Sequence, residues 1–182
     1  MRTLQEQLSG YAAYHRDRRN IATHFVGIPM IVLAVFGLLA RPALLSLGGL
    51  SVSPALFLLL GGVAFYLLLD VRFGLAMLAV TAPAYLFGAW LGAQSTGRWL
   101  VGAAGLFVLG WVIQFVGHAF EGKKPAFVDD LVGLLIGPLF LVAETAFALG
   151  LRTDVRDAIE AKVGPTHGGT KGSLATGSSG SS

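Results

Sequence analysis

The sequence predicts an all-α, polytopic membrane helical bundle with four full transmembrane helices, a broken or re-entrant fifth segment and an N-terminal interfacial amphipathic helix. Composition and charge distribution predict this class. Of the 182 residues, 54% are hydrophobic and 13% are charged, whereas soluble domains carry roughly 25% charge. Only four charged residues lie between Phe25 and Gly117. So few charges cannot cover a water-facing surface, which excludes an ordinary soluble domain, a disordered chain, a coiled coil and a nucleic-acid-binding protein.

The first element is an amphipathic helix that we expect to lie on the membrane. Leu4, Leu8 and Tyr11 recur at the three-to-four spacing of one helix face. We interpret Tyr11 and Tyr14 as anchors at the membrane–water interface. Residues 1–20 are mostly polar, so no secretory signal peptide is predicted.

Five apolar runs follow, and the first four predict full membrane spans. A bilayer core of about 30 Å needs about 20 apolar residues in a helix. The runs occupy residues 25–40, 54–69, 73–93, 99–117 and 131–150. The loops are short, so neighbouring helices should be antiparallel. In the last run, Gly137-Pro138 predicts a break at which the segment returns, although a plain fifth helix with a proline kink also fits its length.

The distribution of Lys and Arg predicts the orientation of the chain. If the fifth segment re-enters, eleven of the 13 basic residues share the side of the N-terminus. Positive charge accumulates on the cytoplasmic side, so we expect an integral protein of a bacterial inner membrane with a cytoplasmic N-terminus. Residues 1–163 should form one integral membrane domain. Residues 164–182 read as a disordered Gly/Ser-rich tail with a linker-like end, so His167 is left out of the chemistry.

The three histidines outside the tail are the residues that best indicate a function. His15 and His24 precede the first span and His118 closes the fourth, so antiparallel spans place all three at one face of the membrane. His15 and His24 are nine residues apart, which puts them on opposite sides of a continuous helix. The helix must therefore break between them to share a metal, and Asn20 is a plausible cap.

A polar stripe surrounds the third histidine. Gln114, His118 and Glu121 follow at i, i+4 and i+7 on an otherwise apolar helix, so the stripe should face inward. The chain has no cysteine, which leaves nitrogen and oxygen ligands. Imidazoles with carboxylate or amide oxygens suit Fe(II), Zn(II) or Mn(II), and the pattern does not select among them. The alternative is that each histidine is a hydrogen-bonded interfacial side chain.

Other charged residues near the spans allow two interpretations each. Lys123 and Lys124 are positive-inside charges or a binding point for a carboxylate head group. Glu144 either orients a histidine N–H or pairs with Arg41 or Arg72.

Three sequence blocks, YAAYHRDRRNIATHFVGIP, QFVGHAFEGKKPA and GPLFLVAE, resemble the membrane-bound 2-hydroxy fatty acid dioxygenase family. The resemblance runs from about Leu4 to about Glu144. It implies a small multi-helical, Fe(II)-dependent enzyme of fatty acid α-oxidation, which uses O₂ to remove one carbon from a 2-hydroxy acyl chain. The family pattern falls on His15, Asn20, His24, Gly27, Pro29, Gln114, Gly117, His118, Pro125 and Ala126, with Glu121 as the acidic residue.

The resemblance implies a role for each candidate residue. His15, His24 and His118 would hold Fe(II), with Glu121 as a further ligand or an orienting group. Asn20, Gln114 and Glu121 would belong to the catalytic machinery. Apart from the resemblance, the position of Lys123 and Lys124 beside such a metal site would let them bind the substrate carboxylate. The expected partners are a 2-hydroxy fatty acid, O₂ and membrane lipid, with no nucleic acid, and the sequence does not set the oligomeric state.

Two other functional classes compete with this interpretation. One is a different lipid-modifying membrane metalloenzyme, such as a hydroxylase or desaturase, but the HxxxH and HxxHH clusters of those enzymes are absent from the sequence. The other is a non-enzymatic small membrane transporter or scaffold, in which the His, Gln and Glu side chains form a polar path.

Overall fold

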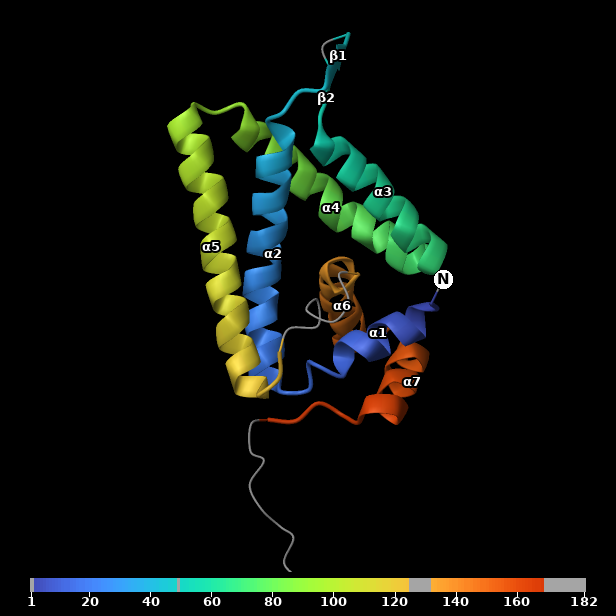
Figure 1. Cartoon of the computed structure of the whole chain (residues 1–182). Helices are drawn as coiled ribbons and strands as arrows, with labels where there is room; N and C mark the ends of the chain where they lie inside the picture. Colours follow the sequence, from blue (N-terminus) through green and yellow to red (C-terminus); the bar gives the residue numbers. More distant parts are fainter. Residues whose placement is uncertain (1, 49, 125–131, 169–182) are drawn as a thin grey trace, which may run out of the picture.

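A computed structural model describes residues 2–48, 50–124 and 132–168 of the chain (Figure 1). Within these residues the fold is helical, as predicted, with one small antiparallel β-hairpin that we did not predict. The elements are α1 (Leu4–Ala12), α2 (Arg18–Ala40), β1 (Leu45–Leu47), β2 (Leu50–Val52), α3 (Pro54–Leu69), α4 (Val71–Gly92), α5 (Thr96–Glu121), α6 (Gly133–Ala148) and α7 (Thr153–Val163).

Three of the described helices, α2, α4 and α5, are long and apolar enough to cross a membrane. Helix α3 is also apolar but has only 16 residues. It ends at Asp70, whose extended backbone stops α3 and whose side chain caps α4 by accepting a hydrogen bond from the Phe73 N–H. By length, three of the four expected full spans are therefore present. The helices are compatible with an integral membrane protein.

The predicted break at Gly137-Pro138 is wrong, because the fifth apolar run forms one helix and the chain turns only after it. Helix α6 continues through Gly137 and Pro138, and the chain turns by 113° between α6 and α7. The turn follows Gly150, which has a φ of 72°. The Leu151 N–H donates to the Ala146 carbonyl at 2.8 Å, which is the closing bond of a Schellman motif. A glycine with positive φ ends a helix at this position. An internal proline, in contrast, is tolerated in an apolar helix whose backbone is packed against its neighbours.

Helix α1 forms at the predicted place, but protein covers its apolar face. Leu4, Leu8 and Tyr11 are buried in one core cluster with residues of α6 and α7. The partners in that cluster include Ile136, Leu139, Phe140, Val155 and Ile159. Contacts with α6 and α7 thus replace the membrane contact that we expected for this face.

Helices α2 and α5 run side by side along most of their length (Figure 1). Small residues permit this approach, because a Cβ atom on Gly27 would lie 2.8 Å from the Gly110 carbonyl oxygen. A Cβ atom on Gly117 would lie 2.6 Å from Oδ1 of Asn20. Close glycine contacts of this kind are typical of helix pairs in lipid. They bring the start of α2 against the end of α5.

The chain stays packed beyond residue 163, where we placed the domain boundary. The His167 N–H donates to the Arg16 carbonyl at 2.8 Å, and the Arg18 N–H donates to the His167 carbonyl at 2.9 Å. Residues 164–168 therefore lie across the connection between α1 and α2. The remainder of the predicted tail, residues 169–182, lies outside the described part of the chain.

Candidate metal centre

Three buried histidines meet at one end of the α2–α5 pair. His15 lies in the connection between α1 and α2, His24 in the second turn of α2 and His118 near the end of α5. Their exposed fractions are 0%, 1% and 7%. One ring nitrogen of each lies within 4.8 Å of the others. The structure thus brings together the three imidazoles that the span topology assigned to one membrane face.

The helix breaks between His15 and His24, but Asn20 is not the cap. Helix α1 ends at Ala12, and the Asp17 side chain caps α2 by accepting a hydrogen bond from the Arg19 N–H at 2.8 Å. Asp17 is an equally good cap residue that precedes Asn20. Asn20 lies inside α2, where its amide nitrogen donates to the Tyr14 carbonyl at 3.2 Å.

Backbone carbonyls fix the tautomers of two histidines. Nδ1 of His15 lies 2.7 Å from the Tyr11 carbonyl oxygen, and Nδ1 of His24 lies 2.8 Å from that of Asn20. A carbonyl oxygen only accepts hydrogen bonds, so each Nδ1 carries the proton and each Nε2 presents a lone pair. The two Nε2 atoms are 3.0 Å apart.

This donor set fits a divalent transition metal. Two lone pairs at 3.0 Å repel each other unless a positive charge lies beside both. Burial lowers the pKa of the His15 imidazole well below its ordinary value, so this ring does not supply that charge as an imidazolium. Nδ1 of His118 is buried, has no hydrogen-bond partner among the described residues and offers a third nitrogen. Imidazoles held by carbonyls through their other nitrogen are typical of metal sites.

Glu121 lies beside this cluster but faces the connection between α1 and α2. Its carboxylate accepts hydrogen bonds from the Arg16 N–H at 3.0 Å, the Asp17 N–H at 2.8 Å and the Asn20 amide at 3.1 Å. It is not one of the three grouped side chains. Of the two roles that we considered, this geometry favours orientation of His15 over ligation.

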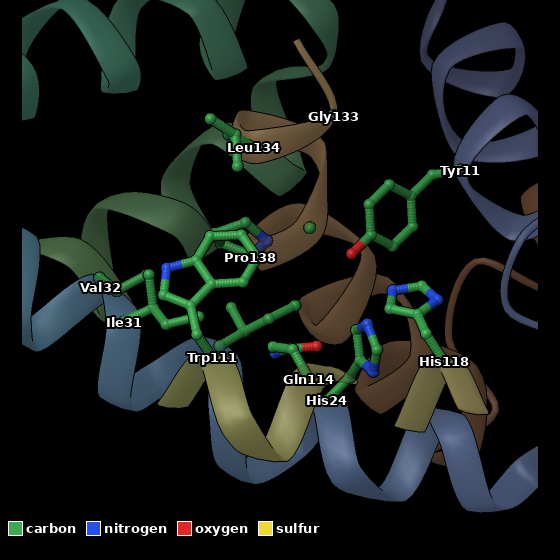
Figure 2. Close-up of a pocket in the computed structure, with 12 residues that line it drawn as sticks. Tyr11, His24, Ile31, Val32, Trp111, Gln114, His118, Gly133, Leu134 and Pro138 are labelled. Carbon is green, nitrogen blue, oxygen red and sulfur yellow. The ribbon is translucent and has the colours of Figure 1, made fainter. Parts of the chain in front are cut away.

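A cavity of about 70 Å³ opens beside the histidines (Figure 2). His24, His118 and Gln114 line it. Gln114 is 3% exposed, and within the described part of the chain neither its amide oxygen nor its amide nitrogen has a hydrogen-bond partner. A buried amide without a partner is costly, so this group is suited to binding a polar ligand in the cavity.

Tyr11 is a site residue that sequence reasoning missed. Its hydroxyl points into the cavity (Figure 2), and its ring stacks on His15 with a centroid separation of 4.1 Å. Burial raises the pKa of the Tyr11 phenol above its ordinary value, so the hydroxyl stays protonated and can donate. The available signal was its position four residues before His15, a spacing that would place both on one face of a continuous helix.

Other predicted residues lie outside the cavity. Lys123 is exposed, and its Nζ donates to the Ala13 carbonyl at 2.6 Å. Neither Lys123 nor Lys124 is among the cavity-lining residues. Glu144 lines a separate polar pocket with Arg16 and Glu160, partners that we did not anticipate.

Comparison with known proteins agrees with the sequence blocks. Residues 1–149 match the family model described as 2-hydroxy-palmitic acid dioxygenase Mpo1-like. A curated relative from Saccharomyces cerevisiae, the 2-hydroxy-palmitic acid dioxygenase MPO1, is 30% identical over 159 residues. The alignment covers 86% of this chain and 87% of the yeast protein. No solved structure matches the chain.

Proposed function

Because this chain belongs to the Mpo1-like family of 2-hydroxy-palmitic acid dioxygenases, we propose that it is an Fe(II)-dependent enzyme that cleaves 2-hydroxy fatty acids to the acid one carbon shorter. The observation that carries the metal assignment is the pair of Nε2 atoms of His15 and His24, 3.0 Å apart with lone pairs facing. Together with Nδ1 of His118, which no described residue binds, they would form a three-nitrogen donor set.

The three histidines would hold the iron, and the rest of the chain keeps them in place. When bound, the iron supplies the binding and activation of O₂. The Tyr11 and Asn20 carbonyls fix the rings of His15 and His24, so both rings remain neutral donors. Glu121 holds the backbone next to His15 through two amides. Asn20 and Glu121 are therefore positioning residues in this proposal.

Tyr11 and Gln114 would orient the polar end of the substrate. The Tyr11 hydroxyl and the Gln114 amide both face the histidine cavity. A 2-hydroxy acid presents a hydroxyl and a carboxylate on adjacent carbons, and these groups can bind the Tyr11 hydroxyl and the Gln114 amide, which has no hydrogen-bond partner among the described residues. Fixing that end beside the metal converts a random encounter into an oriented one.

The proposed reaction balances without an external reductant. One 2-hydroxy acid and one O₂ give the acid one carbon shorter, CO₂ and water. The bond between C1 and C2 breaks, C1 leaves as CO₂ and C2 becomes the new carboxyl carbon. O₂ accepts all of the electrons that these carbons lose. Hydroxylation or desaturation by O₂ would instead require a separate electron donor.

We place the metal centre at the cytoplasmic face of a bacterial inner membrane. The support is the excess of Lys and Arg on the side of the N-terminus. His24 at the start of α2 and His118 at the end of α5 are on that side. A substrate in the lipid would then reach the histidines from the same leaflet.

The test uses the protein purified in detergent and loaded with Fe(II) without oxygen. Addition of 2-hydroxy-palmitic acid and O₂ should produce the acid one carbon shorter, detected by mass spectrometry. His118→Ala should lose both iron and product. His167→Ala is the matched control, because that side chain is exposed outside the cluster and only its backbone binds Arg16 and Arg18.

Two results would contradict the proposal. One is full turnover by His118→Ala. The other is wild-type protein that retains no transition metal and forms no product, which would favour the transporter or scaffold alternative.

A further inference from the structure

A second, larger cavity adjoins the histidine cavity. It has a volume of about 440 Å³ and lies among α2, α3, α5 and α6, with Thr81 of α4 also in its lining. The two cavities share five lining residues, which lie on the side of the histidine cavity away from His118 (Figure 2). These residues are Ile31, Val32, Trp111, Leu134 and Pro138. The two cavities therefore adjoin, and the side chains at their junction are apolar.

The larger cavity leads from the helix ends toward the middle of the spans. Phe36, which lines it, lies about 18 Å along α2 from His24 at 1.5 Å per residue. Phe107, on α5, lies about 16 Å from His118 by the same measure. Half of a hydrocarbon core of about 30 Å is about 15 Å, the depth of one leaflet of acyl chains. The path therefore has the length and the apolar lining that one long acyl chain requires.

We propose that this cavity binds the acyl chain of the 2-hydroxy acid and that its wall at Gly62 sets the longest chain accepted. The inference rests on the proposed function, because it takes the polar end of the substrate to lie at the histidines. Gly62 lines the cavity from α3. It lies between Tyr66, whose hydroxyl donates to the Leu135 carbonyl of α6, and Leu58, which packs with Phe36.

The space around Gly62 allows a larger side chain to be introduced there, which would shorten the cavity. A Cβ atom there would meet only Cε2 of Tyr66, at 3.9 Å, which is an ordinary contact. A leucine could therefore be placed at this position without a backbone clash, and its side chain would occupy the cavity midway along α3. Long chains would then be excluded, while short chains would still reach the histidines.

A third cavity, of about 370 Å³ among α2, α4 and α6, is a less suitable path. It shares only Ile28, Val32 and Pro138 with the histidine cavity. Trp111, which the first two cavities share, does not line it. The larger cavity is therefore the direct continuation of the site.

The test compares Gly62→Leu with Gly61→Leu. Gly61 is the adjacent residue of α3, is exposed and has open space around its would-be Cβ atom. Both variants thus make the same change in helix propensity, but only one adds bulk to the cavity. kcat/KM is measured for 2-hydroxy acids of increasing chain length, together with iron content and thermal unfolding.

We expect Gly62→Leu to lose at least about tenfold in kcat/KM for 2-hydroxy-palmitic acid, because pocket contacts worth one methylene already give about that discrimination. Its iron content and its activity on short-chain acids should match the wild type. Gly61→Leu should keep the wild-type chain-length profile. Gly62→Ala should show a smaller shift of the same sign and covers the case in which Gly62→Leu does not fold.

An unchanged chain-length profile in folded Gly62→Leu would overturn the inference. So would a shift that appears instead in Val80→Trp, since Val80 is an exposed residue that lines only the third cavity. Binding of the same acids without O₂ separates this inference from the proposed reaction. If the wild type binds long acids, Gly62→Leu does not, and no product forms, then the chain site stands and the proposed chemistry fails.

Discussion

At the scale of single residues, the buried amide of Gln114 should destabilise the fold and, in the proposed function, bind the substrate. Its amide is buried and has no partner in residues 2–48, 50–124 and 132–168, so Gln114→Leu should raise the thermal stability of the metal-free protein. The same change should raise KM for the 2-hydroxy acid by about tenfold or more, since a hydrogen bond to a charged group contributes about 1.5–3 kcal/mol. Iron content should not change. Differential scanning calorimetry and steady-state kinetics measure the two effects.

The control for this prediction is Gln94→Leu. The Gln94 amide donates to the Trp90 carbonyl on an exposed surface far along the chain from the histidines. It should alter neither KM nor iron content. A Gln114→Leu enzyme with wild-type KM would show that the amide does not contact the substrate.

A substitution of Glu121 can distinguish two roles of its carboxylate. It either positions His15 through the backbone amides or binds the metal as a ligand. Glu121→Gln replaces one acceptor oxygen by a donor that faces the amides of Arg16 and Asp17. We expect weaker iron binding because His15 is then held less firmly, with activity restored at saturating Fe(II). Iron titration followed by activity measurement tests this. Activity that stays low at every Fe(II) concentration would instead identify Glu121 as a ligand.

The residue types of the site could be predicted from the sequence better than their roles. Four antiparallel spans place the start of the first span and the end of the fourth on the same side of the membrane. This predicted that His15, His24 and His118 lie at one membrane face, and the structure brings them together. The cap between them was assigned to Asn20 instead of Asp17, because both residue types cap helices and no pattern in the sequence ranks them. Tyr11 was interpreted as an interface anchor, since α6, which covers it, is distant in the sequence.

At the scale of helices, the close approach of α2 and α5 sets the geometry of the metal centre. A methyl group on Gly117 would overlap Asn20 and Thr23 of α2. Gly117→Ala should therefore push the helix ends apart and lower iron content and activity together. Gly105→Ala, on the same helix but with open space at its Cβ position, should leave both unchanged. Metal analysis and turnover of the two variants check this, and wild-type iron in Gly117→Ala would contradict it.

The helices also show where sequence patterns mislead. Gly137-Pro138 predicted the break in the last segment, yet α6 passes through it. The actual break follows Gly150, whose positive φ ends the helix. An internal proline costs less where neighbouring helices enclose the backbone, and that enclosure is a tertiary property that local sequence does not contain.

At the scale of the whole molecule, bound metal should hold separate parts of the chain together. The three histidines come from the α1–α2 connection, α2 and α5, and α1 itself packs on α6 and α7. A ligand present at a hundred times its dissociation constant stabilises a fold by about 2.7 kcal/mol. Chelation of iron should therefore lower the melting temperature of the wild type. His118→Ala should show no such response, and an equal response in both proteins would place the stabilising metal elsewhere.

The class of the molecule could be predicted from its lack of charge, but the number of its spans could not. Composition alone excluded a water-facing surface, which required no knowledge of helix ends. Span counting depends on those ends, and Asp70 terminates α3 after only 16 residues. The carboxylate of Asp70 also pairs with Arg152 at 3.0 Å, a contact between segments that no local pattern announces.

The packing of α1 on α6 and α7 has a consequence for biosynthesis. A ribosome makes residues 4–12 before residues 133–163. Helix α1 can therefore pack only after α6 and α7 are made. The same holds for the positioning of His15, which lies three residues beyond α1. In the proposed enzyme, iron binding is therefore a late step of maturation, and a nascent chain that stops before α6 should bind no iron.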